Sequence, residues 1–123
     1  MARKKNPHAN NGQFAGIPIL LIKHPVWGAL DPAAVTVLLG ICARYKGYRN
    51  GEIAFSCREA ADFANISKNT AARAFRRLQE LGIIKCVTES NFDCRKKLAR
   101  EWALTYQPVN NKPPTNEWKN YKS

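Results

Sequence analysis

Residues 56–82 read SCREAADFANISKNTAARAFRRLQELG and contain the signals of two short helices joined by a tight turn. Ser56 followed by Glu59 is typical of a capping box, in which each side chain satisfies a backbone donor of the other residue. Asn65 tolerates the left-handed conformation that a sharp turn between two helices requires. The stretch therefore predicts a helix-turn-helix unit.

The second helix of this unit is expected over residues 67–81. Ser67 is a favourable N-cap, and Gly82 stands where a left-handed residue ends a helix. At about 100° per residue, the apolar positions fall within an arc of roughly 120°, the width of a core-facing stripe. The stripe consists of Ala71, Ala74, Phe75, Leu78 and Leu81.

The opposite side of the same helix is polar and basic. It carries Asn69, Arg73, Arg76 and Glu80, with Thr70, Ala72 and Arg77 on the shoulders. A helix that buries one stripe and presents arginines from a rigid support suits the major groove of DNA. In the first turn, the free backbone amides of Lys68, Asn69 and Thr70 are expected to reach a phosphate. A surface ion pair between Arg76 and Glu80 is the competing interpretation.

The charge balance points to a polyanionic partner. The chain of 123 residues has 20 basic and 9 acidic side chains, a formal net charge of +11. Such an excess favours DNA, RNA or an anionic membrane surface. No apolar run approaches the roughly 18 residues of a membrane span, and no secretory signal opens the chain. We therefore expect no membrane partner and a cytoplasmic, nucleoid-associated protein.

The sequence offers no pattern of an enzyme. It lacks paired carboxylates in an apolar setting, a glycine-rich phosphate loop and a plausible Cys–His pair. The four cysteines form no Cys-x-x-Cys pair, so neither a metal site nor a cofactor is expected. They are interpreted as reduced packing thiols: Cys42, Cys57, Cys86 and Cys94.

One domain between two tails is expected. Residues 1–13 are polar and basic without periodicity, which predicts a flexible N-terminal tail. The domain covers residues 14–107. Residues 108–123 begin with a linker-like break and predict a flexible C-terminal tail. The tail aromatics Trp118 and Tyr121 then either pack back onto the domain or dock on a partner.

The domain is expected to begin with an apolar lead-in over residues 14–30, which is broken by prolines. This segment predicts a short strand or one helical turn, with Trp27 docking on the core. Asp31-Pro32 then begins an apolar helix, because aspartate is an N-cap and proline suits the first helical position. The helix is expected to end near residues 45–47.

Three short strands are expected beside the helices. They cover residues 52–55, 83–89 and 98–106. The last two flank residues 90–97, a polar hairpin tip with three consecutive basic residues.

Three helices, a short strand after the first and a hairpin after the third are typical of a winged helix. Residues 67–84 are similar to the recognition helix and first wing strand of bacterial winged helix-turn-helix proteins. The chain resembles the GntR-type regulators, without their effector domain, and the winged domains of plasmid and phage replication initiators. The lead-in over residues 14–30 is more like the second group.

This resemblance covers residues 14–107 and implies an α+β, mainly α fold. The fold would be a winged helix-turn-helix with a three-helix core and a C-terminal two-stranded β-hairpin wing. By the same resemblance, Ser67 and Thr70 would contact phosphates or base edges, together with Arg73. The wing tip would correspond to Arg95, Lys96 and Lys97.

The first hypothesis is a sequence-specific double-stranded DNA-binding protein, a small transcriptional regulator or a replication or transfer control protein of a bacterial mobile element. Helix 67–81 would read the major groove and the 90–97 wing would contact phosphates, and the DNA-bound form would be a homodimer. The candidate DNA-binding residues are Ser67, Lys68, Asn69, Thr70, Arg73, Arg76, Arg77, Arg95, Lys96 and Lys97.

The alternative hypothesis is an interaction adaptor that uses the winged helix as a protein-binding surface. Trp118 and Tyr121 would form its docking motif, because a fully solvated tail gains nothing from large aromatic side chains. RNA binding is a third interpretation. It is less favoured because the sequence lacks the exposed stacking aromatics of sheet-based RNA modules.

Overall fold

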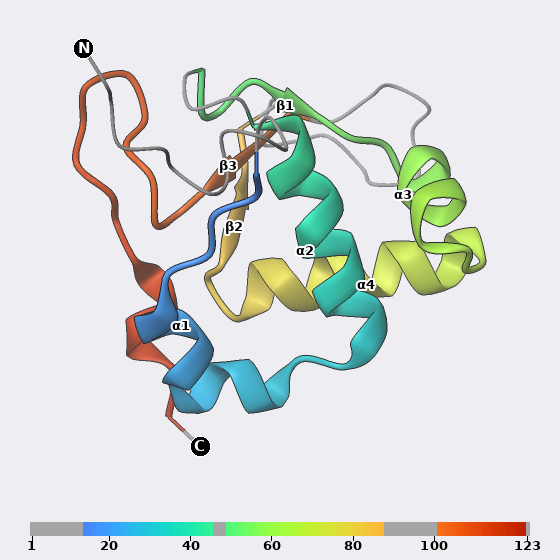
Figure 1. Ribbon diagram of the computed structural model, residues 1–123, viewed down its shortest axis with the longest axis horizontal. Helices are drawn as coiled ribbons and strands as arrows, with labels where there is room; N and C mark the ends of the chain where they lie inside the picture. The colour runs from blue at the N-terminus through green and yellow to red at the C-terminus, as the bar shows by residue number, and fades with distance from the viewer. Residues whose placement is uncertain (1–13, 46–48, 88–100, 123) are drawn as a thin grey trace, which may run out of the picture.

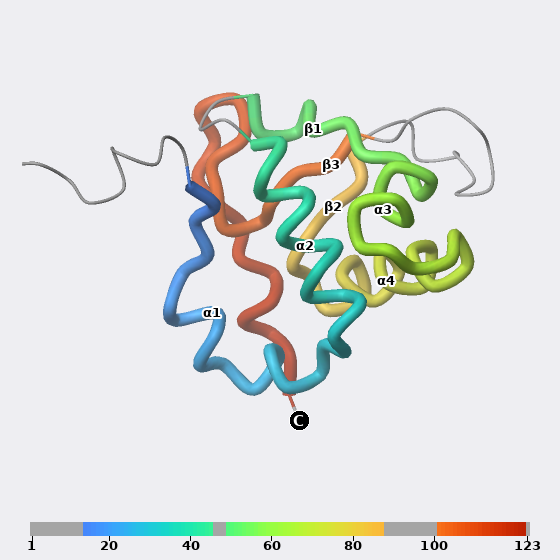
Figure 2. Tube along the Cα trace, turned by 45° about the vertical axis from the view of Figure 1, so that its right-hand side comes forward, coloured from blue at the N-terminus to red at the C-terminus, as the bar shows by residue number. Residues whose placement is uncertain are grey.

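The computed structural model describes residues 14–45, 49–87 and 101–122. These residues form an α+β structure, about half helical, with a small three-stranded antiparallel sheet (Figures 1 and 2). The order of elements is α1 (Ile19–Lys23), η2 (Pro25–Ala29), α2 (Pro32–Arg44), β1 (Ile53–Ala54), α3 (Cys57–Ala64), α4 (Lys68–Glu80), β2 (Ile84–Cys86), β3 (Glu101–Leu104) and η3 (Glu117–Asn120). None of the helices in these ranges is long and apolar enough to cross a membrane.

Helix α2 is the centre of the domain and packs against both α3 and α4. Its start is as predicted: the Asp31 carboxylate accepts a hydrogen bond from the Ala34 amide at 2.8 Å, and Pro32 occupies the first turn. The helix buries Ala34, Val37, Leu38, Gly40, Ile41 and Cys42.

The two predicted short helices joined by a tight turn are present as α3 and α4. Ser56 and Glu59 form the reciprocal capping box at the start of α3, with hydrogen bonds of 2.9 and 3.1 Å. Asn65 ends α3 in the left-handed conformation, with a φ of 59°. Ser67 then caps α4, and the apolar stripe of α4 is buried at all five predicted positions.

The sheet has the strand order β1-β3-β2, so the last strand in sequence lies in the middle. Ile53 pairs with Trp102, and Ile84 pairs with Leu104. All three strands occur where strands were predicted, although β2 and β3 are shorter than residues 83–89 and 98–106. The intervening residues 88–100, with most of the predicted wing, lie outside the described part of the chain.

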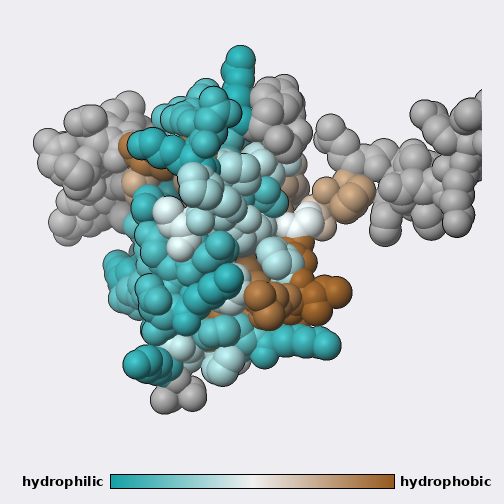
Figure 3. Space-filling view, turned by 90° about the vertical axis from the view of Figure 1, so that its left-hand side faces the viewer, coloured by the Kyte–Doolittle hydropathy of each residue, from teal (hydrophilic) through white to brown (hydrophobic). Residues whose placement is uncertain are grey.

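The apolar lead-in forms two short helical pieces, α1 and η2, which agrees with the helical alternative. Leu21 and Val26 turn into the core, and Trp27 packs at its edge, half-buried. The other apolar side chains of α1 remain exposed. Figure 3 faces the side of the molecule on which α1 lies and shows a group of apolar side chains there.

Part of residues 108–123, which were expected to be a flexible tail, packs on the domain around η3. Trp118 in η3 is only 1% exposed and meets the His24 ring edge-on at 5.3 Å. The Asn116 amide donates to the Thr105 carbonyl at 2.9 Å, and Tyr121 packs against the core. The mostly polar composition of this segment did not predict the packing. One tryptophan is enough to anchor a short segment, because its side chain buries a large apolar surface.

The C-terminal segment packs directly against Gly82. Its φ of +78° is in the left-handed region, and a Cβ there would lie 2.8 Å from the Glu117 carbonyl carbon. The neighbouring Lys85 forms an ion pair with Glu117 at 3.2 Å. The residue that ends α4 therefore also provides the space for the last turn of the chain.

Replacing Gly82 with alanine should destabilise the fold. Gly82→Ala combines a strained backbone with a clash against backbone atoms, so we expect the free energy of unfolding to fall by at least about 2 kcal/mol in urea denaturation. Gly28→Ala is the matched control, because nothing lies within 4 Å of the added Cβ. A change of similar size in both variants would contradict the proposed role of Gly82.

Candidate nucleic-acid interface

The interface candidate is the exposed side of α4. Asn69, Arg73 and Arg76 are all exposed, whereas the apolar stripe on the opposite side is buried. The helix rests on α2 and α3 through that stripe, so its rotation about its own axis is fixed. The three polar side chains predicted to face outward therefore do so together.

The start of α4 connects three of the predicted residues. The Ser67 hydroxyl oxygen accepts a hydrogen bond from the Thr70 amide at 3.1 Å and lies 2.9 Å from the Thr70 hydroxyl oxygen. The Arg73 guanidinium donates to the same Thr70 hydroxyl at 3.4 Å. Thr70 thus completes the helix cap and also meets Arg73. Lys68 and Asn69 lie beside this network, exposed.

Arg77 differs from Arg73 and Arg76 because it forms an ion pair and also contacts a residue outside α4. Its guanidinium donates to the Ala29 carbonyl at 3.4 Å and pairs with Glu80 at 3.4 Å. The expected alternative of an Arg76–Glu80 pair is therefore wrong. Within the described ranges, Arg76 has no ion-pair partner.

Six of the ten predicted site residues lie together on α4 or its cap. The structure brings together Ser67, Lys68, Asn69, Thr70, Arg73 and Arg76 at one side and end of α4, and it places Arg77 on the flank beside η2. The predicted wing residues Arg95, Lys96 and Lys97 lie outside the described part of the chain, as does the basic tail of residues 1–13.

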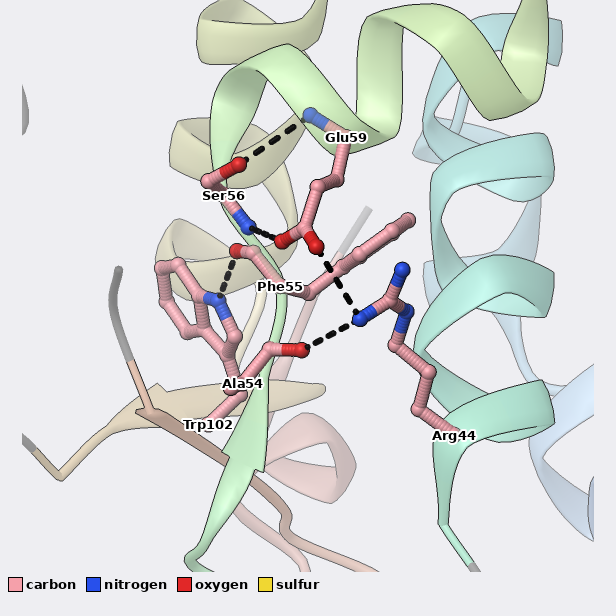
Figure 4. Close-up of polar contacts among 6 residues, drawn as sticks. All are labelled: Arg44, Ala54, Phe55, Ser56, Glu59 and Trp102. Carbon is pink, nitrogen blue, oxygen red and sulfur yellow. Dashed lines mark hydrogen bonds and ion pairs between the residues drawn. The ribbon is translucent and has the colours of Figure 1, made fainter. Parts of the chain in front are cut away.

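A polar network that sequence reasoning missed holds the helix-turn-helix on the rest of the domain (Figure 4). Arg44, at the end of α2, donates to the Ala54 carbonyl at 3.0 Å and pairs with Glu59 at 3.4 Å. Its guanidinium also lies over the Phe55 ring, 4.6 Å from the centroid. Arg44 therefore joins α2, β1 and the first turn of α3, which supports α4.

The pKa of Glu59 is lowered by this arrangement. The largest cause is the hydrogen bond from the Ser56 backbone amide, and the positive charge of Arg44 acts in the same direction. Both interactions stabilise the ionised carboxylate, so the capping box is strongest when Glu59 is charged.

The cysteines that the structure describes are not arranged as a metal site. Cys42 is buried, with its sulfur 3.1 Å from the Tyr106 hydroxyl oxygen, and burial raises the pKa of its thiol. The described residues contain no group of three or more His, Cys, Asp or Glu side chains that could hold a metal ion.

Comparison with protein-family models, curated proteins and solved structures gives no match for this chain. The assignment of the interface therefore depends on its own geometry and charge.

The Glu59 network should make stability depend on pH. A lowered carboxyl pKa contributes stability above the unfolded value, about 4.3, and this contribution is lost as the pH falls through the folded value. Glu59→Gln keeps a capping amide but removes the charge. We expect it to be less stable than the wild type at about pH 6, with a smaller difference at about pH 3.

Urea denaturation at both pH values measures this difference. Glu52→Gln is the control, because Glu52 is an exposed carboxylate outside the network. A Glu59→Gln difference that stays constant with pH would contradict the role of the charged capping box.

Proposed function

We propose that this chain is a sequence-specific double-stranded DNA-binding protein that inserts α4 into the major groove. The observation that carries this proposal is the joint exposure of Asn69, Arg73 and Arg76 on a helix whose other side is fixed in the core. Arginine and asparagine are the side chains that make bidentate contacts to guanine and adenine in the major groove.

The end of α4 that would enter the groove is accessible. The described C-terminal segment packs at the other end of α4, where Glu117 and Trp118 approach Gly82 (Figure 1). At the N-terminal end, the Thr70 amide is bonded to the Ser67 hydroxyl, but the backbone amides of Lys68 and Asn69 and the exposed Lys68 side chain are suited to a phosphate. The formal charge of +11 favours the approach of a polyanion to any part of the surface.

The topology supports a winged helix-turn-helix as the fold of this DNA-binding unit. One short strand lies between α2 and α3, and the other two follow α4, with β3 between its neighbours. In this proposal the segment between Val87 and Glu101 is the wing, and Arg95, Lys96 and Lys97 neutralise phosphates beside the groove.

The proposed biological role is control of transcription, or of replication or transfer, in a bacterial mobile element. The adaptor alternative loses its main support, because Trp118 is buried in the domain and is not free to dock on a partner. DNA binding is thus the function that the exposed groups favour.

Arg73→Ala should weaken binding to the preferred duplex by about 1–3 kcal/mol and relax the preference at one base pair. The measurement is fluorescence anisotropy with a duplex selected from a random library by the wild-type protein. Lys112→Ala is the matched control, because it removes one exposed positive charge from the C-terminal segment. Equal binding of selected and random duplexes by the wild type would contradict sequence-specific recognition.

Binding should also depend steeply on salt. About six to eight phosphate contacts predict a slope of roughly −5 to −7 for log K against log salt concentration. Replacing Arg95, Lys96 and Lys97 together with alanine should make the slope shallower by about two to three. The same anisotropy titrations at a series of salt concentrations measure it, and an unchanged slope would remove the wing from the proposed interface.

A further inference from the structure

Asn50 is a buried asparagine whose side-chain amide is held by hydrogen bonds on both sides. It is 4% exposed. Its nitrogen donates to the carbonyls of Leu104 and Gln107 at 2.9 and 3.1 Å, and its oxygen accepts from the Leu104 backbone amide at 2.8 Å. The amide group therefore faces the end of β3, and the side chain cannot turn away without breaking three hydrogen bonds.

The residue after Asn50 is a glycine in a tight turn. The Glu52 amide donates to the Arg49 carbonyl at 3.0 Å, which closes a β-turn. Asn50 and Gly51 are its central residues, and Gly51 has a φ of +100°, a conformation that favours glycine. Glycine is also the residue that least hinders attack of its own backbone amide on a preceding asparagine side chain, because it has no Cβ. The turn thus combines a reactive pair of residues with a side chain that is held in place.

We propose that Asn50 is a site of spontaneous deamidation that the fold blocks and that opening of this turn unblocks. In the reaction, the Gly51 backbone nitrogen attacks the side-chain carbonyl carbon of Asn50. A new C–N bond closes a succinimide ring, the bond to the side-chain nitrogen breaks, and this nitrogen leaves as ammonia with the proton of the Gly51 amide. Water then opens the ring at either carbonyl and leaves aspartate or isoaspartate at position 50. Water is the only co-reactant.

The folded state opposes the first step. The attack requires the side-chain carbonyl carbon of Asn50 to turn toward the next backbone amide. Its oxygen and nitrogen are instead bonded to the backbone of Leu104 and Gln107, 54 and 57 residues along the chain. The reaction should therefore proceed only from states in which the end of β3 and the turn have separated.

Both products are incompatible with the folded turn. An aspartate side chain carries no donor when it is ionised, so it would face the Leu104 and Gln107 carbonyls with a buried negative charge. An isoaspartate adds one carbon to the main chain, which disrupts the hydrogen bond between Glu52 and Arg49. The modification should thus be one-way, because a chain that reacts while it is open no longer closes correctly.

The consequence extends from the turn to α4 through the sheet. Strand β1 begins directly after the turn, and its Ile53 pairs with Trp102 of β3. Trp102 in turn stacks on Phe75 of α4, with the ring centroids 4.8 Å apart. Loss of the Asn50 contacts therefore loosens the strand that supports α4. The inference does not require DNA binding, because its experiments measure mass and folding alone.

The first experiment measures deamidation in the full chain, folded and unfolded in urea, at mildly alkaline pH. Asn11-Gly12 is the other Asn-Gly pair of the sequence, so the two sites must be separated. Cleavage after lysine gives a peptide of residues 47–68, and its fragmentation in the mass spectrometer locates the exchange of NH₂ for OH at position 50. A synthetic peptide with the sequence of residues 49–54, measured in both solvents, corrects for the effect of urea on the chemistry.

Deamidation at Asn50 should be at least about a hundredfold slower in the folded chain than in the unfolded chain, because a buried, hydrogen-bonded segment is open for only a small fraction of the time. Equal rates in the two states would overturn the proposal. So would an Asn50 that does not react in the unfolded chain.

The second experiment tests whether the product is incompatible with the fold. Asn50→Asp should lower the urea midpoint of unfolding by at least about 1 M, because a buried charge replaces a hydrogen-bonded amide. Asn120→Asp is the matched control, the same substitution at an exposed asparagine of η3, and should unfold close to the wild type. A midpoint that Asn50→Asp leaves unchanged would contradict a one-way modification.

The third experiment uses the natural products of the reaction, so it does not depend on whether Asn50→Asp folds. The wild-type chain is kept in urea until part of it has reacted and is then diluted into buffer, and size-exclusion chromatography separates refolded from unfolded protein. The refolded fraction should contain unmodified Asn50, and the fraction that fails to refold should be enriched in aspartate and isoaspartate at position 50. The same proportion of these products in both fractions would overturn the proposal.

Discussion

The stacking of Phe75 on Trp102 is the contact on which the orientation of α4 depends. The two rings lie 4.8 Å apart and are almost parallel, and the Trp102 indole N–H donates to the Phe55 carbonyl at 2.9 Å. The middle strand therefore holds one side of α4 and the segment that leads into α3 at the same time. Since Phe75 is fixed inward, Arg73 and Arg76 must face outward.

Local signals were sufficient to predict the helix-turn-helix. Caps, a left-handed asparagine and a periodic apolar stripe act within a few residues of chain, so Ser56, Ser67 and the buried side of α4 could be placed from the sequence. Contacts between distant residues could not. Asn50 is buried and exchanges hydrogen bonds with the backbone of Leu104, 54 residues further along the chain.

The C-terminal segment shows why composition alone predicted a flexible tail where part of the chain packs on the domain. Its residues are mostly polar, and the burial of Trp118 depends on residues that are distant in the sequence. These are Gly82, which has no side chain at the end of α4, and His24, whose ring Trp118 meets edge-on. Once Trp118 is inserted there, Lys85 can pair with Glu117. The same docking places Trp118 against His24 at the end of α1, so the first and last described helical elements, α1 and η3, lie together on one side of the domain (Figures 1 and 2).

The two ends of α4 consequently have different roles. At the C-terminal end, Glu117 packs against Gly82, and Arg77 contacts the Ala29 carbonyl and Glu80. At the N-terminal end, the Ser67–Thr70–Arg73 network is exposed, and a ligand can reach it without breaking a buried contact. Arg77 would first have to leave its partners. Because exposed ion pairs contribute only about 0–1 kcal/mol, this cost is small, and Arg77 is better suited to a phosphate at the rim than to a base.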